Sequence, residues 1–436
     1  MSDIINVPYG NESLKIDVSN INIKQVITPK DVNLPDDLEF EIQKALNNPI
    51  GSGKISDIVA SETKNSKKVE STEELDVVII SDDNTRLTPS NLILPPILKE
   101  METAGISRDK IKIVMALGTH RDMTEKEMID KVGKYVYNNY NIVNHNYYNK
   151  NKLEDLGTTE YGTPILINKD VYEADIVIGI GSIVPHHIPG FSGGAKIIQP
   201  GVSGSLTTAY THLLSVRKRR SFLGYIENPV REEMEDIARK VGANYIFNTV
   251  LSREGDFYKC FFGDVAEAFR EGVKASQEVY EVEIDSTSPV TLAGSFPCNI
   301  EFWQAHKSLY PGDMITEDDG MLIVLTPAYE GVSVTHSGML EYTSLRPEVI
   351  NKMVENDEIE DKVAAALAMA WSKITDRLDV VLVSEGINKE TAAALNFKYA
   401  DSVEKALKIA EEKYGENFSM NVLTHAPDTL PILNNK

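Results

Sequence analysis

The stretch GIGSIVPHHIPGFSGGAKIIQPGVSGSLTTAYTH, residues 179–212, passes from a strand-like apolar start through a glycine-rich passage to a helix-like end. It carries adjacent histidines at 186 and 187, one lysine at 196 and a third histidine at 212. Its glycines allow positive φ or a close approach of backbone to a bound group, at an entropic cost. Those glycines include Gly181, Gly190, Gly193 and Gly194. The stretch therefore predicts a strand, a ligand-holding loop and a helix.

Two earlier apolar runs, LDVVII (75–80) and IKIVMAL (111–117), resemble the run ADIVIGI (174–180) that leads into this stretch. Each of the three is followed by a polar loop. Continuous apolar runs that alternate with helix-like segments are typical of a parallel sheet with helices on both faces. We therefore expect an α/β fold with mainly parallel strands.

Unusual polar residues follow each of these runs. They are Asp83 and Arg86 after the first, His120 and Arg121 after the second, and His186 and His187 after the third. Ligands of open α/β sheets bind at the carboxyl ends of the strands, so these residues should converge on one site. A simple surface ion pair remains an alternative for Asp83 and Arg86, although an arginine fork also suits a carboxylate ligand.

The second part of the chain has its own strand and helix signals. Short apolar runs at 291–294, 321–325 and 380–383 alternate with helical segments, including one at 403–413. The passage VEIDSTSPV marks a boundary, so we predict an N-terminal domain of residues 1–284 and a C-terminal domain of residues 285–436. The segment INVPYGNESLKIDV near the start predicts a β-hairpin, which this division places in the N-terminal domain.

Composition limits the classes of function. The chain has 436 residues, 42% of them hydrophobic, and a formal net charge of −22, which argues against general binding to nucleic acid or anionic membranes. The basic run RKRR (217–220) is expected to be a local patch at a helix end. Two cysteines and no charged, apolar leader predict a cytoplasmic protein. The sequence leaves the oligomeric state undecided, and a homodimer is one of the options.

The polar residues of the opening stretch allow several kinds of chemistry. Lys196 could act as a covalent amine or as a fixed positive charge, and GGAK lacks the Gly-Lys-Ser/Thr order of a phosphate-binding loop. His186, His187 and His212 could surround zinc as in a hydrolase, although adjacent histidines point in different directions. His120 suits acid–base work near neutral pH.

The sequence resembles the nickel-dependent lactate racemases, a family of 2-hydroxyacid racemases and epimerases. The matching blocks are DNTR (83–86), GTHR (118–121), PHHIPGFSGGAKIIQPG (185–201) with the downstream His212, and WQAHK (303–307). The resemblance implies two α/β domains with the active site in the cleft between them. It also implies a nickel-pincer nucleotide as cofactor, a small 2-hydroxyacid as substrate and cofactor-synthesis proteins as partners.

Roles follow from the resemblance position by position. Lys196 matches the lysine that tethers the cofactor as a thioamide, His212 matches the nickel ligand, and Gly193, Gly194 and Asp83 fall at cofactor-binding positions. His120 and His186 match the acid–base pair, which serves D and L hydroxyls that point to opposite sides. The positions expected to bind the substrate are Arg86, Trp303, Gln304 and Lys307. The implied reaction moves a hydride reversibly from C2 to the cofactor through a 2-ketoacid.

Some positions depart from the family pattern. Asn299 and Trp303 replace the usual residues before Gln304, and Trp371 lies in an AMAWS context that does not fit the family's pocket tryptophan. We therefore expect a 2-hydroxyacid substrate that need not be lactate. The loop AYEGVSVTHSG (328–338) is expected to line a larger or more polar pocket. A zinc hydrolase and a non-catalytic cofactor-binding protein are the alternatives.

Overall fold

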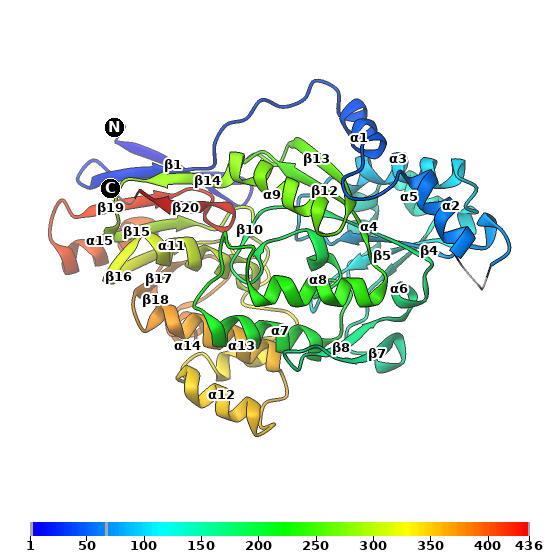
Figure 1. Ribbon diagram of the computed structural model, residues 1–436. Helices are drawn as coiled ribbons and strands as arrows, with labels where there is room; N and C mark the ends of the chain where they lie inside the picture. The colour runs from blue at the N-terminus through cyan, green and yellow to red at the C-terminus, as the bar shows by residue number, and fades with distance from the viewer. Residues whose placement is uncertain (1–2, 66–68, 435–436) are drawn as a thin grey trace.

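The computed structural model describes residues 3–65 and 69–434 and contains two six-stranded sheets lying side by side (Figure 1). The first sheet is parallel except for its β12–β13 edge. In spatial order it comprises β13 (Phe257–Asp264), β12 (Tyr245–Leu251), β9 (Ile176–Ser182), β4 (Val77–Asp82), β5 (Ile111–Ala116) and β6 (Asn141–Asn144). The predicted mainly parallel α/β fold is confirmed.

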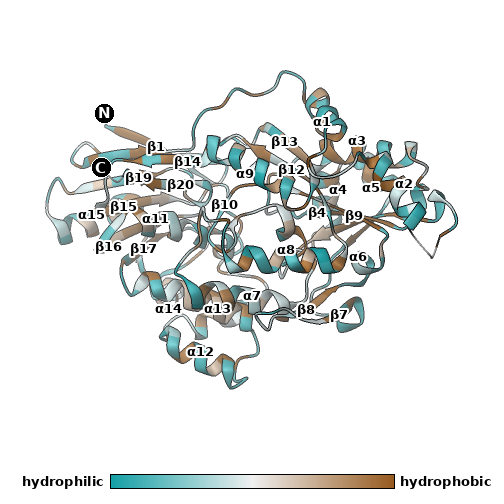
Figure 2. Cartoon of the chain, in the orientation of Figure 1, coloured by the Kyte–Doolittle hydropathy of each residue, from teal (hydrophilic) through white to brown (hydrophobic). Residues whose placement is uncertain are grey.

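Helices cover both faces of the first sheet because its central strands are apolar on both sides. Ile79 faces one cluster, which holds α1 (Leu38–Asn47), α2 (Ile55–Asn65), α3 (Ser90–Thr103), α4 (Glu125–Val132) and α5 (Lys134–Asn139). Ile80 faces the other, which holds α6 (Lys169–Glu173), α8 (Pro229–Val241) and α9 (Glu267–Tyr280). Figure 2 shows the apolar colour concentrated along the strands between these layers.

All neighbouring strands of the second sheet are parallel. The order is β18 (Lys398–Ala400), β17 (Asp379–Val383), β16 (Thr316–Leu325), β15 (Ser288–Gly294), β19 (Ser419–Leu423) and β3 (Asn22–Ile27). One face packs on α11 (Leu309–Ile315), α12 (Pro347–Glu355), α13 (Lys362–Thr375) and α14 (Lys389–Ala394). The other packs on α15 (Val403–Tyr414) and on the hairpin of β1 (Ile4–Tyr9) and β2 (Glu12–Asp17).

The N-terminal strands differ from the predicted division of the chain. The hairpin forms as expected, but it packs on the second sheet, and β3 pairs with β19 as the edge strand of that sheet. The reason is tertiary: Val7 and Ile16 bury their side chains against Leu292 and Ile323 of the second sheet. Residues 4–27 therefore belong with the C-terminal half, and the boundary near residue 285 stays a prediction.

Shorter elements complete the fold around the two sheets. They are β7 (Leu153–Thr158) with β8 (Pro164–Asn168), β10 (Pro185–His186) with β11 (Gly190–Phe191), β14 (Glu281–Ile284) with β20 (Leu430–Leu433), and the helices α7 (Ser205–Lys218) and α10 (Phe302–Ala305). In Figure 1, α7 lies beside α13, and Leu213 of α7 shares a core cluster with Leu367 of α13. None of the helices in the described part of the chain combines the length and apolar character needed to cross a membrane.

Candidate active site

A cavity lies where the strand ends of the first sheet meet the region of α10 in the C-terminal half. Nearly all the residues predicted for the site line it, namely Asp83, Arg86, His120, His186, Gly193, Lys196, His212, Trp303, Gln304 and Lys307. Gly194 lies behind the cavity wall, where its N–H donates to Asn248 Oδ1 at 2.8 Å. The structure thus brings together residues separated by more than two hundred positions, from both halves of the chain.

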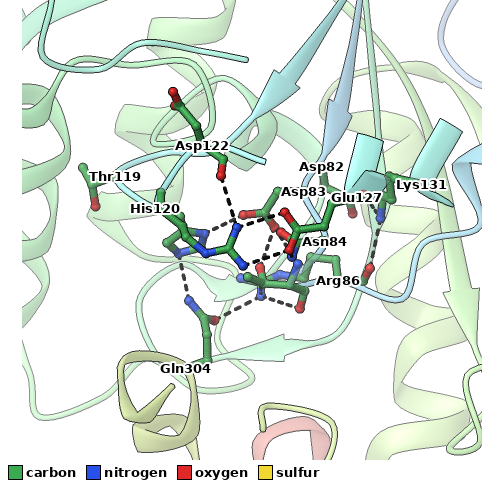
Figure 3. A network of polar contacts seen from close by, with 12 residues as sticks. Asp82, Asp83, Asn84, Arg86, Thr119, His120, Asp122, Glu127, Lys131 and Gln304 are labelled. Atoms are coloured by element: carbon green, nitrogen blue, oxygen red, sulfur yellow. Dashed lines mark hydrogen bonds and ion pairs between the residues drawn. The ribbon is translucent and has the colours of Figure 1, made fainter. Parts of the chain in front are cut away.

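His120 is held from both ring nitrogens (Figure 3). Nδ1 lies 2.6 Å from Asp83 Oδ2, and Nε2 lies 2.8 Å from Gln304 Nε2. Although burial alone would raise the pKa of Asp83, the contacts with His120 and Arg86 bring that pKa well below its usual range, so the carboxyl is ionised. The ionised Asp83 accepts a hydrogen bond from Nδ1–H, and the Gln304 amide donates one to Nε2. His120 therefore carries its proton on Nδ1, and the Nε2 lone pair, which accepts from Gln304 here, is the one that a general base uses.

Two cations fix the orientation of the Gln304 amide. Arg86 Nη1 donates to Gln304 Oε1 at 3.2 Å, and Lys307 Nζ donates to the same oxygen. Burial, together with the charge of Arg86, lowers the pKa of Lys307 to about 8. The pair concentrates positive charge beside the base, which suits the carboxylate of an acid substrate.

His186 is buried and keeps its place through its neighbours. The N–H of Ile188 donates to His186 Nδ1 at 3.2 Å, and the His187 ring stacks on the His186 ring at 4.7 Å between centroids. His187 in turn stacks on Tyr310 at 3.8 Å. Burial, and then the charge of Lys196, lowers the pKa of His186 well below its usual value, so the ring is neutral. His187 thus packs between the His186 and Tyr310 rings and lines the same cavity.

Lys196 and His212 approach the cavity from the glycine-rich stretch and from α7. Lys196 lies in a short 3-10 turn, Gly194–Ile197, and burial followed by the charges of Arg86 and Lys307 lowers its pKa well below the usual value. Within the described residues its Nζ makes no hydrogen bond or ion pair. His212 Nδ1 donates to the carbonyl of Thr208 at 2.7 Å, which leaves Nε2 available, and burial lowers the pKa of His212 to about 4.

The zinc alternative lacks a ligand set. Over residues 3–65 and 69–434, no three His, Cys, Asp or Glu side chains gather closely enough to hold a metal ion. The rings of His186 and His187 are stacked with an interplanar angle of 15°, so their nitrogens do not converge with His212 on one point. The hypothesis of a site formed by His186, His187 and His212 is therefore wrong.

The loop 328–338 also differs from expectation. None of its residues lines the cavity, and it contacts the 117–122 loop of the first half instead. Trp371 is buried outside the cavity lining, against Phe302 at 5.3 Å between ring centroids. Long-range contacts decide both placements, and the local sequence gives no sign of them.

Two supports of the glycine-rich stretch were missed by the sequence analysis. The buried Arg231 of α8 donates through Nη1 to the carbonyl of Gly193 at 3.1 Å and through Nη2 to the carbonyl of Phe191, and its guanidinium lies 4.0 Å from the Phe269 ring centroid. Asn248 of β12 accepts from Gly194 and donates to the carbonyl of Gly181 at 3.2 Å. Neither residue carries a local motif, because each acts only through tertiary contacts.

Fold and cavity together define a two-sheet α/β protein in which several histidines, a lysine and the two cations Arg86 and Lys307 meet between the halves. Models of the lactate racemase N-terminal and C-terminal domains match residues 9–224 and 282–432. The chain is 28% identical to the lactate racemase of Thermoanaerobacterium thermosaccharolyticum, covering 98% of each chain. It is 25% identical to the lactate racemase of Lactiplantibacillus plantarum, over 98% of this chain and 99% of that one.

Solved structures agree with these matches. The apoprotein of the Thermoanaerobacterium thermosaccharolyticum lactate racemase superposes with a TM-score of 0.85 at 26% identity, covering 98% of this chain and 100% of that one. A protein from Thermotoga maritima shares the fold, with a TM-score of 0.69 at 20% identity, over 87% of this chain and 98% of that one. The chain belongs to the lactate racemase family.

Proposed function

We propose that the protein is a racemase that inverts C2 of a small 2-hydroxyacid. The names of the two relatives make lactate the first substrate to test, ahead of the other acids that the sequence departures left open. The observation that carries the proposal is the hydrogen-bonded unit of Asp83, His120 and Gln304 beside two cations. It joins a base to a carboxylate-binding position in one cavity.

Different residues of the chain bind the substrate and transfer its hydroxyl proton. Arg86 and Lys307 bind the substrate carboxylate and so fix which way C2 faces. His120 takes the hydroxyl proton of one enantiomer at Nε2, and His186 serves the other enantiomer. Asp83 stabilises the positive charge that develops on His120 when it is protonated. A racemase needs two such groups because the hydroxyls of the enantiomers point to opposite sides.

The free lysine and histidine fit a nickel-pincer nucleotide. A part-buried amine with a lowered pKa and no partner in the described structure is suited to a covalent tether, as proposed for Lys196. His212 offers Nε2 to nickel while Thr208 holds Nδ1, the usual arrangement around a metal-binding histidine. When bound, the group supplies a reversible acceptor for the hydrogen on C2. Loading requires the cofactor-synthesis proteins, which we propose as partners in the cytoplasm.

The experiment is co-production with those proteins, followed by intact mass measurement and a chiral assay of lactate. We expect a mass increase that maps to Lys196 and interconversion of D- and L-lactate. Lys196→Ala should lose both, whereas His120→Ala should keep the adduct and lose turnover. An unmodified Lys196, or full turnover in both His120→Ala and His186→Ala, would contradict the proposal.

A further inference from the structure

Three consecutive residues of one loop contact the C-terminal half, two of them in the loop 328–338 and the middle one in α10. Thr119 Oγ1 lies 2.9 Å from His336 Nε2, His120 Nε2 lies 2.8 Å from Gln304 Nε2, and Arg121 Nη2 lies 2.9 Å from Glu330 Oε1. The middle residue is the general base described above. Its contact with Gln304 is therefore flanked on both sides by contacts between the same halves.

His336 is buried, with a side chain only 4% exposed. Its Nδ1 lies 2.7 Å from Asp361 Oδ2, and its ring stacks on Trp303 at 4.1 Å between centroids with an interplanar angle of 18°. Asp361 is itself anchored, because it caps α13 by accepting from the N–H of Ala364 at 3.0 Å. With Nδ1 donating to this carboxylate, Nε2 accepts from the Thr119 hydroxyl.

The segment that carries His336 also holds the start of α10. The carbonyls of Gly331 and Val332 accept from the N–H groups of Phe302 and Trp303, both at 2.9 Å. These are first-turn donors, which a helix this short leaves without partners of its own. The same segment therefore holds the helix that bears Gln304 and the loop that bears His120.

We infer that His336 is a positioning residue that locks the loop of residues 117–122 against α10 and so sets the geometry of the His120–Gln304 pair. The inference rests on the proposed function for its catalytic consequence, but not for its structural one. Without the His336–Thr119 hydrogen bond, His120 can move away from the substrate hydroxyl. A misplacement of about 1 Å can lower the rate on the order of 10²-fold. His336 makes no hydrogen bond to Arg86 or Lys307 in the described residues, so we expect substrate binding to change less than the rate.

Two amide substitutions separate the two bonds of His336. Asn places its side-chain nitrogen near the position of Nδ1, so His336→Asn keeps the Asp361 bond and loses the Thr119 bond. Gln reaches the position of Nε2, so His336→Gln does the reverse. We expect His336→Asn and Thr119→Val each to lower kcat by about tenfold or more, with KM changed less than about twofold. The double variant should lose no more than either single variant, and His336→Gln should lose less.

His425→Asn is the matched control, because within the described residues the His425 side chain hydrogen-bonds only to its sequence neighbour Thr424 and otherwise contacts the Phe296 ring. It should keep the wild-type kcat. Losses that multiply in the His336→Asn, Thr119→Val double variant would show that the two residues do not act through their mutual bond, and would overturn the inference.

A second measurement works even if the protein has no racemase activity. Amide hydrogen exchange of the unloaded full-length protein should become faster in peptides covering 117–122 and 300–305 in His336→Asn, but not in His425→Asn. Unchanged exchange in both peptides would overturn the inference. If exchange becomes faster in His336→Asn but the wild-type protein shows no racemase turnover, the proposed function is contradicted and the positioning role of His336 is not.

Discussion

His120 owes its protonation pattern to residues 37 and 184 positions away in the chain. The GTHR motif indicates a histidine at a strand end, and the family resemblance assigns it an acid–base role. Neither identifies which nitrogen carries the proton. That depends on Arg86 and Lys307, which turn the Gln304 amide so that its nitrogen faces the ring.

Asp83→Asn tests this arrangement. The amide can no longer stabilise a protonated His120, and it can favour the wrong tautomer by donating to Nδ1. We expect kcat to fall by roughly 10²–10⁴-fold with little change in KM, as when the carboxylate of a catalytic triad is replaced. Steady-state assays in both directions measure this, and a normal kcat would contradict the assigned role.

Asp428 provides a prediction about pH and stability. Burial, which outweighs the nearby charges of Lys307 and Arg86, raises the pKa of this carboxyl from its ordinary 3.8 to about 6. Between these values the folded protein holds more protons than the unfolded chain, so this group's stabilising contribution is full below pH 3.8 and is lost as pH rises through 6. The loss amounts to at most about 3 kcal/mol at about 1.4 kcal/mol per pKa unit.

Asp428→Asn should remove this contribution. Urea unfolding at pH 4 and pH 7 should show that the free energy of unfolding falls less with pH in the variant than in the wild type. Identical pH dependence in the two proteins would show that the carboxyl does not have a raised pKa in the folded state.

At the scale of elements, the glycine-rich stretch keeps its shape through contacts with its neighbours. Gly194 has φ +57°, and a Cβ there would lie 2.8 Å from the Phe269 ring, so only glycine fits against α9. Arg231 of α8 binds two carbonyls of the same stretch. The turn that presents Lys196 is thus fixed by two helices that follow it in the chain.

Arg231→Met should unfold more easily, because the carbonyls of Phe191 and Gly193 lose their donors inside the protein. We expect a loss of roughly 2–4 kcal/mol in the free energy of unfolding. The control is Arg239→Ala on the same helix, whose side chain is 52% exposed and 4.0 Å from Asp264, and which should change stability by less than about 0.5 kcal/mol. Equal effects in chemical denaturation would contradict the role of Arg231.

Sequence patterns predicted elements better than contacts between them. The runs at 75–80, 111–117 and 174–180 became β4, β5 and β9, because continuous apolar runs have few stable alternatives to buried strands. The motifs also placed the cavity residues. Arg231, Asn248 and His336 escaped notice because their importance comes only from partners far away in the chain. The loop 328–338 was misplaced for the same reason.

At the scale of the whole molecule, the first residues of the chain complete the second sheet. β3 pairs along β19, and the hairpin of β1 and β2 covers part of the face that includes Leu292. Figure 1 shows both ends of the chain on the side of this sheet. The second half therefore depends on residues that precede the first half.

Residues 285–436 produced alone should aggregate or stay partly unfolded, because the edge of β19 and an apolar face are exposed. The same fragment extended at its C-terminus by a flexible linker and residues 3–30 should recover a cooperative thermal transition. Circular dichroism during heating, with size-exclusion chromatography, distinguishes the outcomes. A well-folded fragment without the extension would contradict the dependence of the second half on residues 4–27.

The most direct test of the central claim follows the hydrogen on C2 during turnover. The loaded protein is incubated with L-lactate in deuterium oxide, and the D-lactate formed is examined by mass spectrometry and proton NMR. If inversion proceeds by return of the same hydride, with His120 and His186 handling only the hydroxyl proton, the D-lactate keeps its original hydrogen at C2. D-lactate that carries solvent deuterium at C2 would show that the histidines remove a carbon-bound proton, and would contradict the account.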